Sequence, residues 1–251
     1  MKTPKIFLHG VPDSPAVWGP LKAALSLPAE DVSTPALPGF TSPPPNDFTA
    51  TKDAYTDWLI TILEQMYATS GPIDIVGHDW GALLTIRAAS LRPELIKSWA
   101  VSGAVIHPDY RGHTTAKRWA TPLLGELVMA ITSKGLLKKT LIDGGLPATV
   151  ASLEAANWNK TQRKCILQLY RSAAGLRFEG DWVEDLQNLP ANGLVLWGEK
   201  DPFVAPQFGR SFAEQQSVPF HVIPETGHWA IAQQPTKIAE HLRALWANQA
   251  I

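Results

Sequence analysis

Short apolar runs that end in turn-forming residues predict six β-strands along the chain. The predicted strands cover residues 5–8, 31–34, 73–76, 98–105, 193–197 and 220–223. Strands that are apolar at consecutive positions are typical of a sheet that is buried on both faces. The pattern therefore favours a mainly parallel sheet with helices on each side.

Amphipathic segments alternate with these strands. Residues 51–68 carry apolar side chains such as Tyr55 and Leu59 at helical spacing, and residues from about 236 to 248 do the same around Ile238. Strands that alternate with such helices indicate an α/β fold.

The alternation stops between residues 107 and 188. This segment predicts helices without a strand, at residues 122–142, 147–157 and 161–174. It also carries aromatic residues suited to line a ligand site, namely Tyr110, Trp119, Trp158, Tyr170 and Trp182. Ligands of open α/β sheets bind at the carboxyl ends of the strands. We interpret residues 107–188 as a helical cap over that edge, and residues 1–106 and 189–251 as the core.

The composition excludes several classes of protein. The chain has 251 residues, with 22 Lys and Arg against 23 Asp and Glu, and 45% of its residues are hydrophobic. The nearly balanced charge gives no basic surface for nucleic acid. The single cysteine, Cys165, excludes an intrachain disulfide and a cysteine-based metal cluster. No apolar run reaches the roughly 18 residues of a membrane span. The first residues lack the apolar region of a signal peptide, so we expect a cytoplasmic protein.

The sequence Gly-His-Asp-Trp-Gly at residues 77–81 is the strongest local signal. It follows a predicted strand and opens a predicted helix. Glycines on both sides of a central residue permit a sharp strand-to-helix turn that presents that residue above the sheet. The pattern indicates Asp79 as a nucleophile. A simpler alternative is that Asp79 only caps the helix, although a cap does not need two flanking glycines.

Two further residues complete a candidate catalytic triad. Asp201 follows the predicted strand 193–197, and His228 follows the predicted strand 220–223. Since the carboxyl ends of parallel strands meet at one edge, we expect both side chains to lie beside Asp79.

The turn after the first strand predicts an oxyanion hole. The sequence His9-Gly10-Val11 ends that strand, and the backbone N–H groups of Val11 and Trp80 are the expected donors. We assign His9 a structural hydrogen bond and His78 a packing role.

These motifs are similar to those of the α/β-hydrolase superfamily, and the similarity covers nearly the whole chain. The order nucleophile, acid, histidine is the order of that family. The sequence Pro-Gly-Phe at residues 38–40 also resembles it. The resemblance implies a hydrolase that acts on a small molecule and needs no metal or organic cofactor.

An aspartate nucleophile limits the reactions that the site can catalyse. The Asp79 carboxylate is ionised at neutral pH and can attack a saturated carbon that bears a leaving group. The product is an alkyl–enzyme ester, and water activated by His228 then hydrolyses it while Asp201 orients the imidazole. A serine-esterase-like activity is therefore disfavoured.

The sequence does not decide which leaving group is displaced, because two families with an Asp nucleophile remain possible. Epoxide hydrolases protonate an epoxide oxygen from cap tyrosines, and Tyr170, with Tyr110 as a second candidate, resembles that arrangement. Haloalkane dehalogenases hold a halide with N–H donors, for which Trp80 and either Trp119 or Trp158 are candidates. We take epoxide hydrolysis of an apolar substrate as the first interpretation and dehalogenation as the alternative. A binding-only relative without turnover is a third possibility, and no oligomeric state is indicated.

Overall fold

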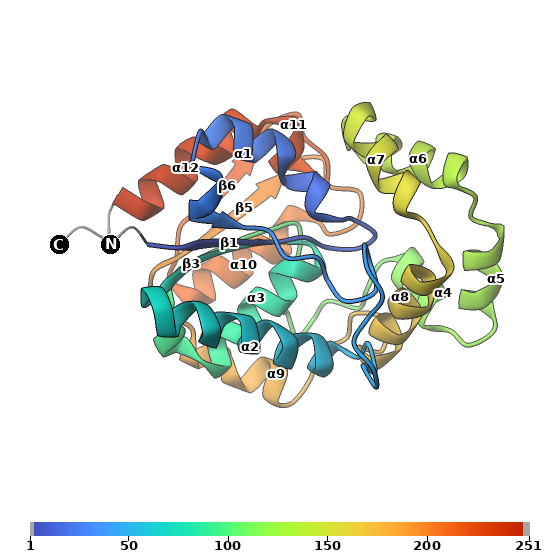
Figure 1. Cartoon of the computed structure of the whole chain (residues 1–251), viewed down its shortest axis with the longest axis horizontal. Helices are drawn as coiled ribbons and strands as arrows, with labels where there is room; N and C mark the ends of the chain where they lie inside the picture. The colour runs from blue at the N-terminus through green and yellow to red at the C-terminus, as the bar shows by residue number, and fades with distance from the viewer. Residues whose placement is uncertain (1–2, 248–251) are drawn as a thin grey trace.

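Six parallel strands form one sheet in the computed structural model, which describes residues 3–247 (Figure 1). The strands are β1 (Lys5–Leu8), β2 (Val32–Ser33), β3 (Ile73–His78), β4 (Ile96–Ser102), β5 (Gly193–Gly198) and β6 (Phe220–Ile223). Their order across the sheet is β2-β1-β3-β4-β5-β6, and every neighbouring pair is parallel. The sequence-based prediction of a parallel sheet of about six strands is confirmed.

The fourth strand ends earlier than the apolar run predicts. The expected strand covered residues 98–105, whereas β4 ends at Ser102. Gly103 follows with a φ of +78°, a left-handed conformation that interrupts an extended strand. The apolar residues after it are buried all the same, which explains why the hydrophobic pattern continued past the strand.

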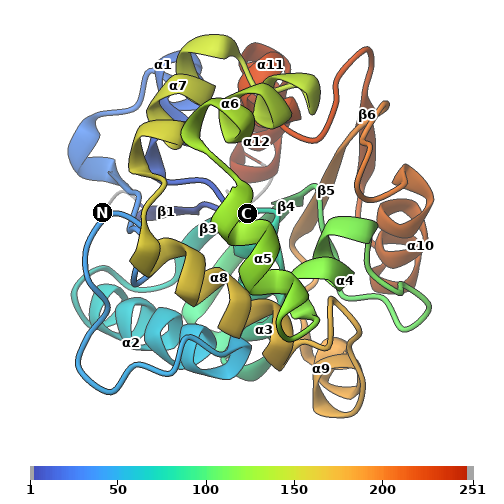
Figure 2. The same cartoon turned by 90° about the vertical axis from the view of Figure 1, so that its right-hand side faces the viewer.

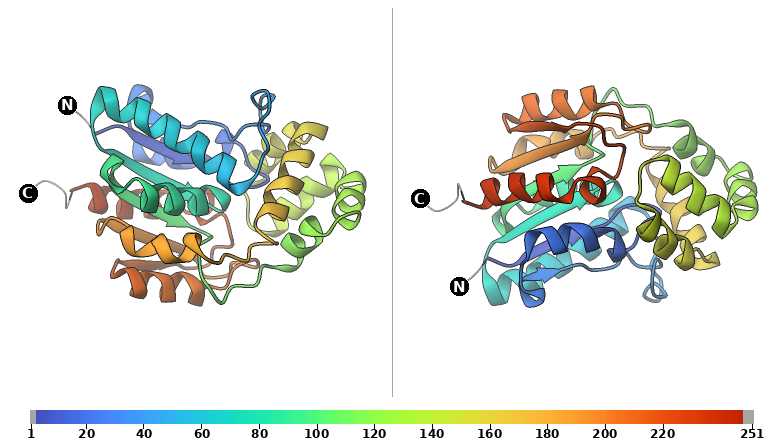
Figure 3. Two further views of the ribbon diagram at one scale, coloured as in Figure 1. Left: turned by 90° about the horizontal axis from the view of Figure 1, so that it is seen from below. Right: turned by 90° about the horizontal axis from the view of Figure 1, so that it is seen from above.

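Helices cover both faces of the sheet (Figure 3). One face carries α1 (Gly19–Leu25), α11 (Ala230–Gln233) and α12 (Pro235–Ala247). The other carries α2 (Lys52–Ser70), α3 (Trp80–Leu91), α9 (Asp181–Glu184) and α10 (Pro206–Gln216). Short 3-10 helices lie in the connections, namely η1 (Pro15–Trp18), η2 (Ala29–Asp31), η3 (Pro93–Leu95) and η4 (Asp185–Asn188).

The two helices predicted from amphipathic spacing are present. Helix α2 begins after Thr51, whose hydroxyl accepts the Ala54 N–H at 3.2 Å, and buries Tyr55 and Leu59. Helix α12 buries Ile238. It is described as far as residue 247, so the predicted end at residue 248 lies outside the described residues.

Five helices gather at the carboxyl ends of the strands (Figures 1 and 2). They are α4 (Thr114–Ala120), α5 (Leu124–Ile131), α6 (Lys134–Asp143), α7 (Ala148–Asn157) and α8 (Lys160–Ser172). The single helix predicted at 122–142 is in fact two helices, because Ser133 starts a new one. Its hydroxyl accepts the Leu136 N–H at 3.1 Å and caps α6.

The end of the segment predicted as a cap packs on the helices beside the sheet. The Trp182 indole of α9 donates to Asp53 of α2 at 2.9 Å, and Arg87 of α3 pairs with Asp185 at 2.7 Å. The helices above the strand ends are therefore α4 to α8. The division at residues 107 and 188 stays a prediction, and its core ranges include residues 1–2 and 248–251, which lie outside the described residues.

Between residues 3 and 247, no helix is both long enough and apolar enough to cross a membrane.

Candidate active site

Asp79 lies in a tight turn between β3 and α3. Its backbone has a φ of +51°, a conformation that non-glycine residues rarely adopt. The glycines on either side are required by close backbone contacts. A Cβ on Gly77 would lie 2.3 Å from the Gly81 carbonyl oxygen, and one on Gly81 would lie 2.0 Å from the Leu8 carbonyl oxygen. The Asp79 side chain makes no capping hydrogen bond to α3, so helix capping does not account for this aspartate.

The structure brings Asp79, His228 and Asp201 together. His228 Nε2 lies 3.4 Å from one Asp79 carboxylate oxygen, and His228 Nδ1 lies 2.8 Å from Asp201 Oδ2. The side chains of His228 and Asp201 are almost completely buried. One histidine thus connects two carboxylates that come from separate strand ends.

Backbone groups fix the Asp201 carboxylate. Its Oδ1 atom accepts the N–H groups of Phe203 at 2.8 Å and of Val204 at 3.1 Å. The other oxygen is left to face His228. This arrangement assigns the His228 Nδ1 proton to the Asp201 side and directs Nε2 toward Asp79.

The imidazolium of His228 forms ion pairs with the carboxylates on either side of it. Burial alone would lower the pKa of His228, but the charges and hydrogen bonds of Asp201 and Asp79 raise it to about 10. Burial alone would raise the pKa of Asp79, whereas His228, His78 and the Val11 N–H hold it below its ordinary value. Asp79 is therefore a carboxylate and His228 a cation at neutral pH.

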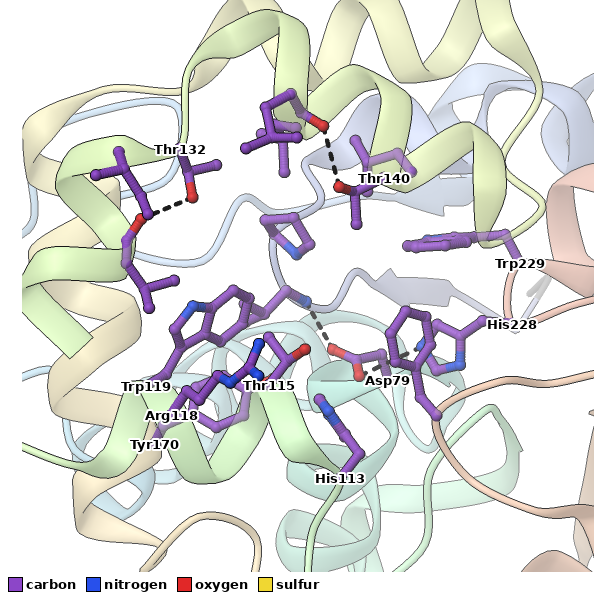
Figure 4. Close-up of a pocket in the computed structure, with 18 residues that line it drawn as sticks. Asp79, His113, Thr115, Arg118, Trp119, Thr132, Thr140, Tyr170, His228 and Trp229 are labelled. Atoms are coloured by element: carbon purple, nitrogen blue, oxygen red, sulfur yellow. Dashed lines mark hydrogen bonds and ion pairs between the residues drawn. The ribbon is translucent and has the colours of Figure 1, made fainter. Parts of the chain in front are cut away.

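One of the two predicted oxyanion donors contacts Asp79. The Val11 N–H donates to Asp79 Oδ1 at 2.7 Å, which leaves the other carboxylate oxygen toward His228 (Figure 4). The Trp80 N–H opens α3 directly after Asp79. In the described part of the chain it makes no hydrogen bond to that carboxylate.

A cavity of about 320 Å³ opens above Asp79 and His228 (Figure 4). The rest of its wall comes mainly from α4, α5 and α6, and most of it is apolar. The residues that line it are Val11, Pro12, Asp79, His113, Thr115, Arg118, Trp119, Val128, Ile131, Thr132, Leu136, Leu137, Thr140, Leu141, Tyr170, Phe203, His228 and Trp229. The arrangement can hold a small apolar molecule against the Asp79 carboxylate.

Two of the predicted leaving-group residues line this cavity. Tyr170 projects from α8, and Trp119, on α4, packs edge-to-face against its ring with centroids 5.0 Å apart. Burial, together with the Asp79 charge, raises the pKa of Tyr170 well above its ordinary value. Tyr170 therefore keeps its proton and is available as a donor.

Tyr110 does not fill the role of a second tyrosine donor in this cavity. Its hydroxyl donates to the Phe203 carbonyl at 3.1 Å, and its ring lines a smaller neighbouring cavity. The loop after β4 turns the phenol toward the backbone near Asp201, where it has an acceptor already. The smaller cavity also includes Asp79, and the role of Tyr110 beside a leaving group stays a prediction.

Two tryptophans predicted as halide donors lie elsewhere. Trp80 is fully buried, and its ring packs against Tyr170 at 5.4 Å without lining the cavity. Trp158 is also buried, and its indole donates to the Thr132 carbonyl at 2.8 Å. In the described part of the chain the Trp80 indole N–H has no hydrogen-bond partner, whereas the Trp158 indole N–H is already bonded to a carbonyl. Neither tryptophan lines the cavity, and their role as halide donors stays a prediction.

The two histidines predicted as structural are buried and neutral. His9 Nε2 accepts the Leu37 N–H at 3.0 Å, and burial lowers the pKa of His9 to about 4. His78 is fully buried with its ring 4.9 Å from that of His228, and burial lowers its pKa to about 3.

Sequence reasoning missed three residues around the site. His113 lines the cavity at the start of α4, and Trp229 lines it directly after His228. Asp13 lies behind Trp229, accepts its indole N–H at 3.0 Å and is fully buried. The polar residue before the α4 segment and the aspartate after the His-Gly turn were the available signals, but neither has a spacing that distinguishes it from an ordinary cap or turn.

Comparisons with known proteins agree with the fold. Mouse epoxide hydrolase 3 is 25% identical over 271 residues, covering 96% of this chain and 69% of the mouse protein. An uncharacterized hydrolase of Bacillus subtilis, YugF, is 25% identical over 201 residues, covering 73% of this chain and 68% of its own.

Solved structures with the same fold act in different ways. The haloalkane dehalogenase DbeA of Bradyrhizobium elkanii superposes with a TM-score of 0.78 at 20% identity, covering 98% of this chain and 91% of that one. A thermophilic esterase of Thermogutta terrifontis superposes with a TM-score of 0.77 at 20% identity, covering 100% and 92%. At such identities the likeness establishes the fold alone.

A family model decides the membership. The model described as the alpha/beta hydrolase family matches residues 6–241, which include the six strands except Lys5 at the start of β1, and all three residues of the candidate triad. The chain therefore belongs to the alpha/beta hydrolase family.

Proposed function

We propose that this hydrolase opens epoxides of small apolar molecules through an ester on Asp79. The proposal rests above all on one observation: Tyr170, a protonated hydroxyl donor, lines the same cavity as the Asp79 carboxylate. An epoxide needs both groups, because its carbon must be attacked while its oxygen takes a proton. The similarity to mouse epoxide hydrolase 3 agrees with this choice.

In the first step, an Asp79 oxygen attacks one epoxide carbon. The ring C–O bond breaks, its electron pair stays on the oxygen, and the Tyr170 proton moves to that oxygen. The imidazolium of His228 then returns a proton to the tyrosinate through the cavity. The result is a hydroxyalkyl ester of Asp79 and a neutral His228.

The second step uses the histidine as a base. Esterification removes the Asp79 charge, which is one of the two carboxylate charges that raise the pKa of His228. Neutral His228 takes a proton from water, whose oxygen attacks the ester carbonyl. The Val11 N–H, 2.7 Å from Asp79 Oδ1, stabilises the oxyanion that forms there. Collapse releases the diol and restores the Asp79–His228 ion pair.

Dehalogenation has less support from the cavity wall. Of the tryptophans considered as halide donors, only Trp119 lines the cavity, while Trp80 and Trp158 are enclosed. The alternative of a binding-only protein without turnover also has less support. It would gain from an Asp79 neutralised by Arg87, but Arg87 pairs with Asp185 at 2.7 Å.

The test is intact-protein mass spectrometry of the His228→Gln variant after incubation with small epoxides and, separately, with bromo- and chloroalkanes. We expect a stable adduct of one epoxide mass, because alkylation proceeds and hydrolysis lacks its base. The matched control is the double variant Asp79→Ala, His228→Gln, which should stay unmodified.

The alternatives give different masses. Adducts from haloalkanes alone would establish dehalogenation instead. An absence of adducts from every compound, or free turnover by the His228→Gln variant, would contradict the two-step mechanism.

A further inference from the structure

His113 is a second polar residue in the cavity wall that faces Asp79. It lies at the N-cap of α4, and it lines both the main cavity and the smaller neighbouring one, each of which also includes Asp79. In Figure 4 the His113 ring points toward the Asp79 carboxylate. The Phe203 ring contacts both imidazoles, with centroids 5.3 Å from His113 and 5.0 Å from His228.

The helix cap fixes which nitrogen of His113 carries the proton. The Ala116 backbone N–H donates to His113 Nδ1 at 3.2 Å. A backbone N–H can only donate, so Nδ1 must present a lone pair. In a neutral imidazole the proton then resides on Nε2. The ring therefore offers an N–H donor, and the cap leaves that donor free of the helix.

The charge state of His113 agrees with this tautomer. Burial lowers the pKa of His113 to about 4, although the Asp79 charge acts in the opposite direction. The positive charges that oppose its protonation come from His228 and Lys117. At neutral pH the ring is uncharged, so it can donate a hydrogen bond without giving up its proton.

Tyr170 and His113 reach the cavity from different helices. Tyr170 belongs to α8, whereas His113 begins α4, and both line the wall together with Asp79. Tyr110, the tyrosine expected as the second donor, is occupied by the Phe203 carbonyl. His113 provides a hydrogen-bond donor in the cavity wall instead.

We propose that His113 is a catalytic residue that hydrogen-bonds the leaving oxygen through its Nε2–H while Tyr170 protonates it. This inference rests on the proposed function. As Asp79 forms its bond to carbon, the electron pair of the breaking C–O bond accumulates on the oxygen. The Tyr170 proton moves to that oxygen, and the His113 proton stays on nitrogen. A neutral imidazole held in one tautomer can polarise an oxygen in this way.

The substitution His113→Asn separates the donor from the cap. Asparagine is among the best N-cap residues, so its side-chain oxygen can accept the Ala116 N–H and keep α4 in place. Its shorter side chain does not reach the position of the imidazole Nε2. His113→Ser has the same logic and serves if the asparagine variant does not fold.

The rate of adduct formation is measured in the His228→Gln background, with and without His113→Asn, using one small epoxide. We expect alkylation to slow by roughly 10²-fold, the usual loss when a donor to a developing oxyanion is removed. In the single variant His113→Asn, rapid quenching and mass spectrometry should give an unchanged rate for hydrolysis of the adduct. A merely structural role would affect both steps and lower the melting temperature.

The outcomes are distinguishable. No adduct in the His228→Gln parent would contradict the proposed function itself. An adduct that forms at the same rate with and without His113→Asn would overturn the role of His113. Equal loss in both steps would also overturn it, because a leaving-group donor acts only while the epoxide opens.

Discussion

At the scale of single residues, the site is organised by the charge on His228. Two carboxylates flank the ring, at 3.4 Å for Asp79 and 2.8 Å for Asp201, and they raise its pKa to about 10. A histidine in this state cannot accept a proton from water. In the proposed mechanism it becomes a base once esterification neutralises Asp79, so the charges set the order of the two proposed steps.

The coupling between Asp79 and His228 can be tested by removing the Asp79 charge. Asp79→Asn removes one of the two charges, so the pKa of His228 should fall clearly below about 10. The measurement is an NMR titration of the His228 ring in the wild type and the variant. An unchanged pKa would mean that Asp201 alone holds the imidazolium, and the proposed switch from acid to base would then fail.

The same charges predict a pH dependence of stability. The folded-state pKa of His228, about 10, lies above the 6.5 of an ordinary histidine, so its ion pairs stabilise the fold fully below pH 6.5. That contribution is lost as the pH rises through 10. Urea unfolding between pH 6 and pH 10 should show a decline in the wild type that is weaker in His228→Gln. Parallel curves for the two proteins would refute it.

At the scale of elements, the turn that carries Asp79 depends on how closely α3 approaches β1. The Gly81 Cα lies against the Leu8 backbone, so α3 starts directly beside the end of the neighbouring strand. The contact sets the height of Asp79 above the sheet and brings it within 2.7 Å of the Val11 N–H.

Gly81→Ala should therefore be destabilising. Its Cβ would lie 2.0 Å from the Leu8 carbonyl oxygen, and backbone must move to make room. Overpacking typically costs ~1–3 kcal/mol of unfolding free energy. Urea denaturation measures the loss. The matched control is Gly19→Ala at the start of α1, where a Cβ meets nothing within 4 Å and the φ of −51° is helical. Equal stability of both variants would contradict the close approach.

A second element-level feature is a pair of buried acids between η1 and α7. Asp13 precedes η1, Glu154 lies on α7, and both side chains are fully buried. Burial and the Asp79 charge raise the pKa of Asp13 to about 7, while the Trp229 indole and His228 act against this rise. Burial and the Asp13 charge raise the pKa of Glu154 to about 8, opposed by Ser14 and the Val17 backbone. Burial therefore favours the protonated form of both acids.

Glu154→Gln tests this contact. A carboxyl whose folded pKa is raised contributes stability that is present below its unfolded pKa, near 4.5, and is lost as the pH rises through about 8. The variant should therefore gain stability relative to the wild type between pH 5 and pH 9, measured by chemical denaturation. A difference between the two that does not change with pH would show that Glu154 keeps its charge in the fold.

At the scale of the whole molecule, the cavity lies between the carboxyl edge of the sheet and the helices above it. The cavity of about 320 Å³ takes Asp79 and His228 from the strand ends, whereas α5 and α6 contribute apolar residues such as Val128, Ile131 and Leu137 to its wall. In the proposed reaction, the attacking carboxylate and its histidine therefore come from other parts of the chain than the apolar wall that limits substrate size. Changes in α6 should alter which epoxides react without altering how they react.

Leu137→Trp on α6 puts this to the test, because Leu137 lines the cavity and is buried. Filling the space should reduce kcat/KM for a bulky aromatic epoxide by tenfold or more, in the ~10–200-fold range of a steric change in an apolar pocket. A small alkyl epoxide should be affected much less. The control Leu127→Trp changes an exposed residue of α5 outside the cavity. An equal loss for both substrates would place the substrate elsewhere.

The amino-acid sequence was enough to predict the approximate positions of the strands, the turn at Asp79 and the order of the three residues at the strand ends. These signals are local: a buried strand needs a run of apolar residues, and the turn needs glycine at positions 77 and 81. Parallel strands end at a common edge, so Asp201 and His228 could be brought to Asp79 without further information.

Which residues between 107 and 188 line the cavity beside Asp79 depends on how distant parts of the chain pack together. Tyr110, Trp158 and Tyr170 are all aromatic residues of the segment between 107 and 188. Of the three, only Tyr170 lines the cavity of about 320 Å³, whereas the other two donate to carbonyls of Phe203 and Thr132. His113 has the sequence pattern of a helix cap, and its place in the cavity wall comes from the fold around it. An aromatic or polar side chain on a helix has the same local pattern whether it packs inward or lines a cavity. The rotation of each helix against its neighbours makes that choice, and contacts between residues far apart in the chain fix it.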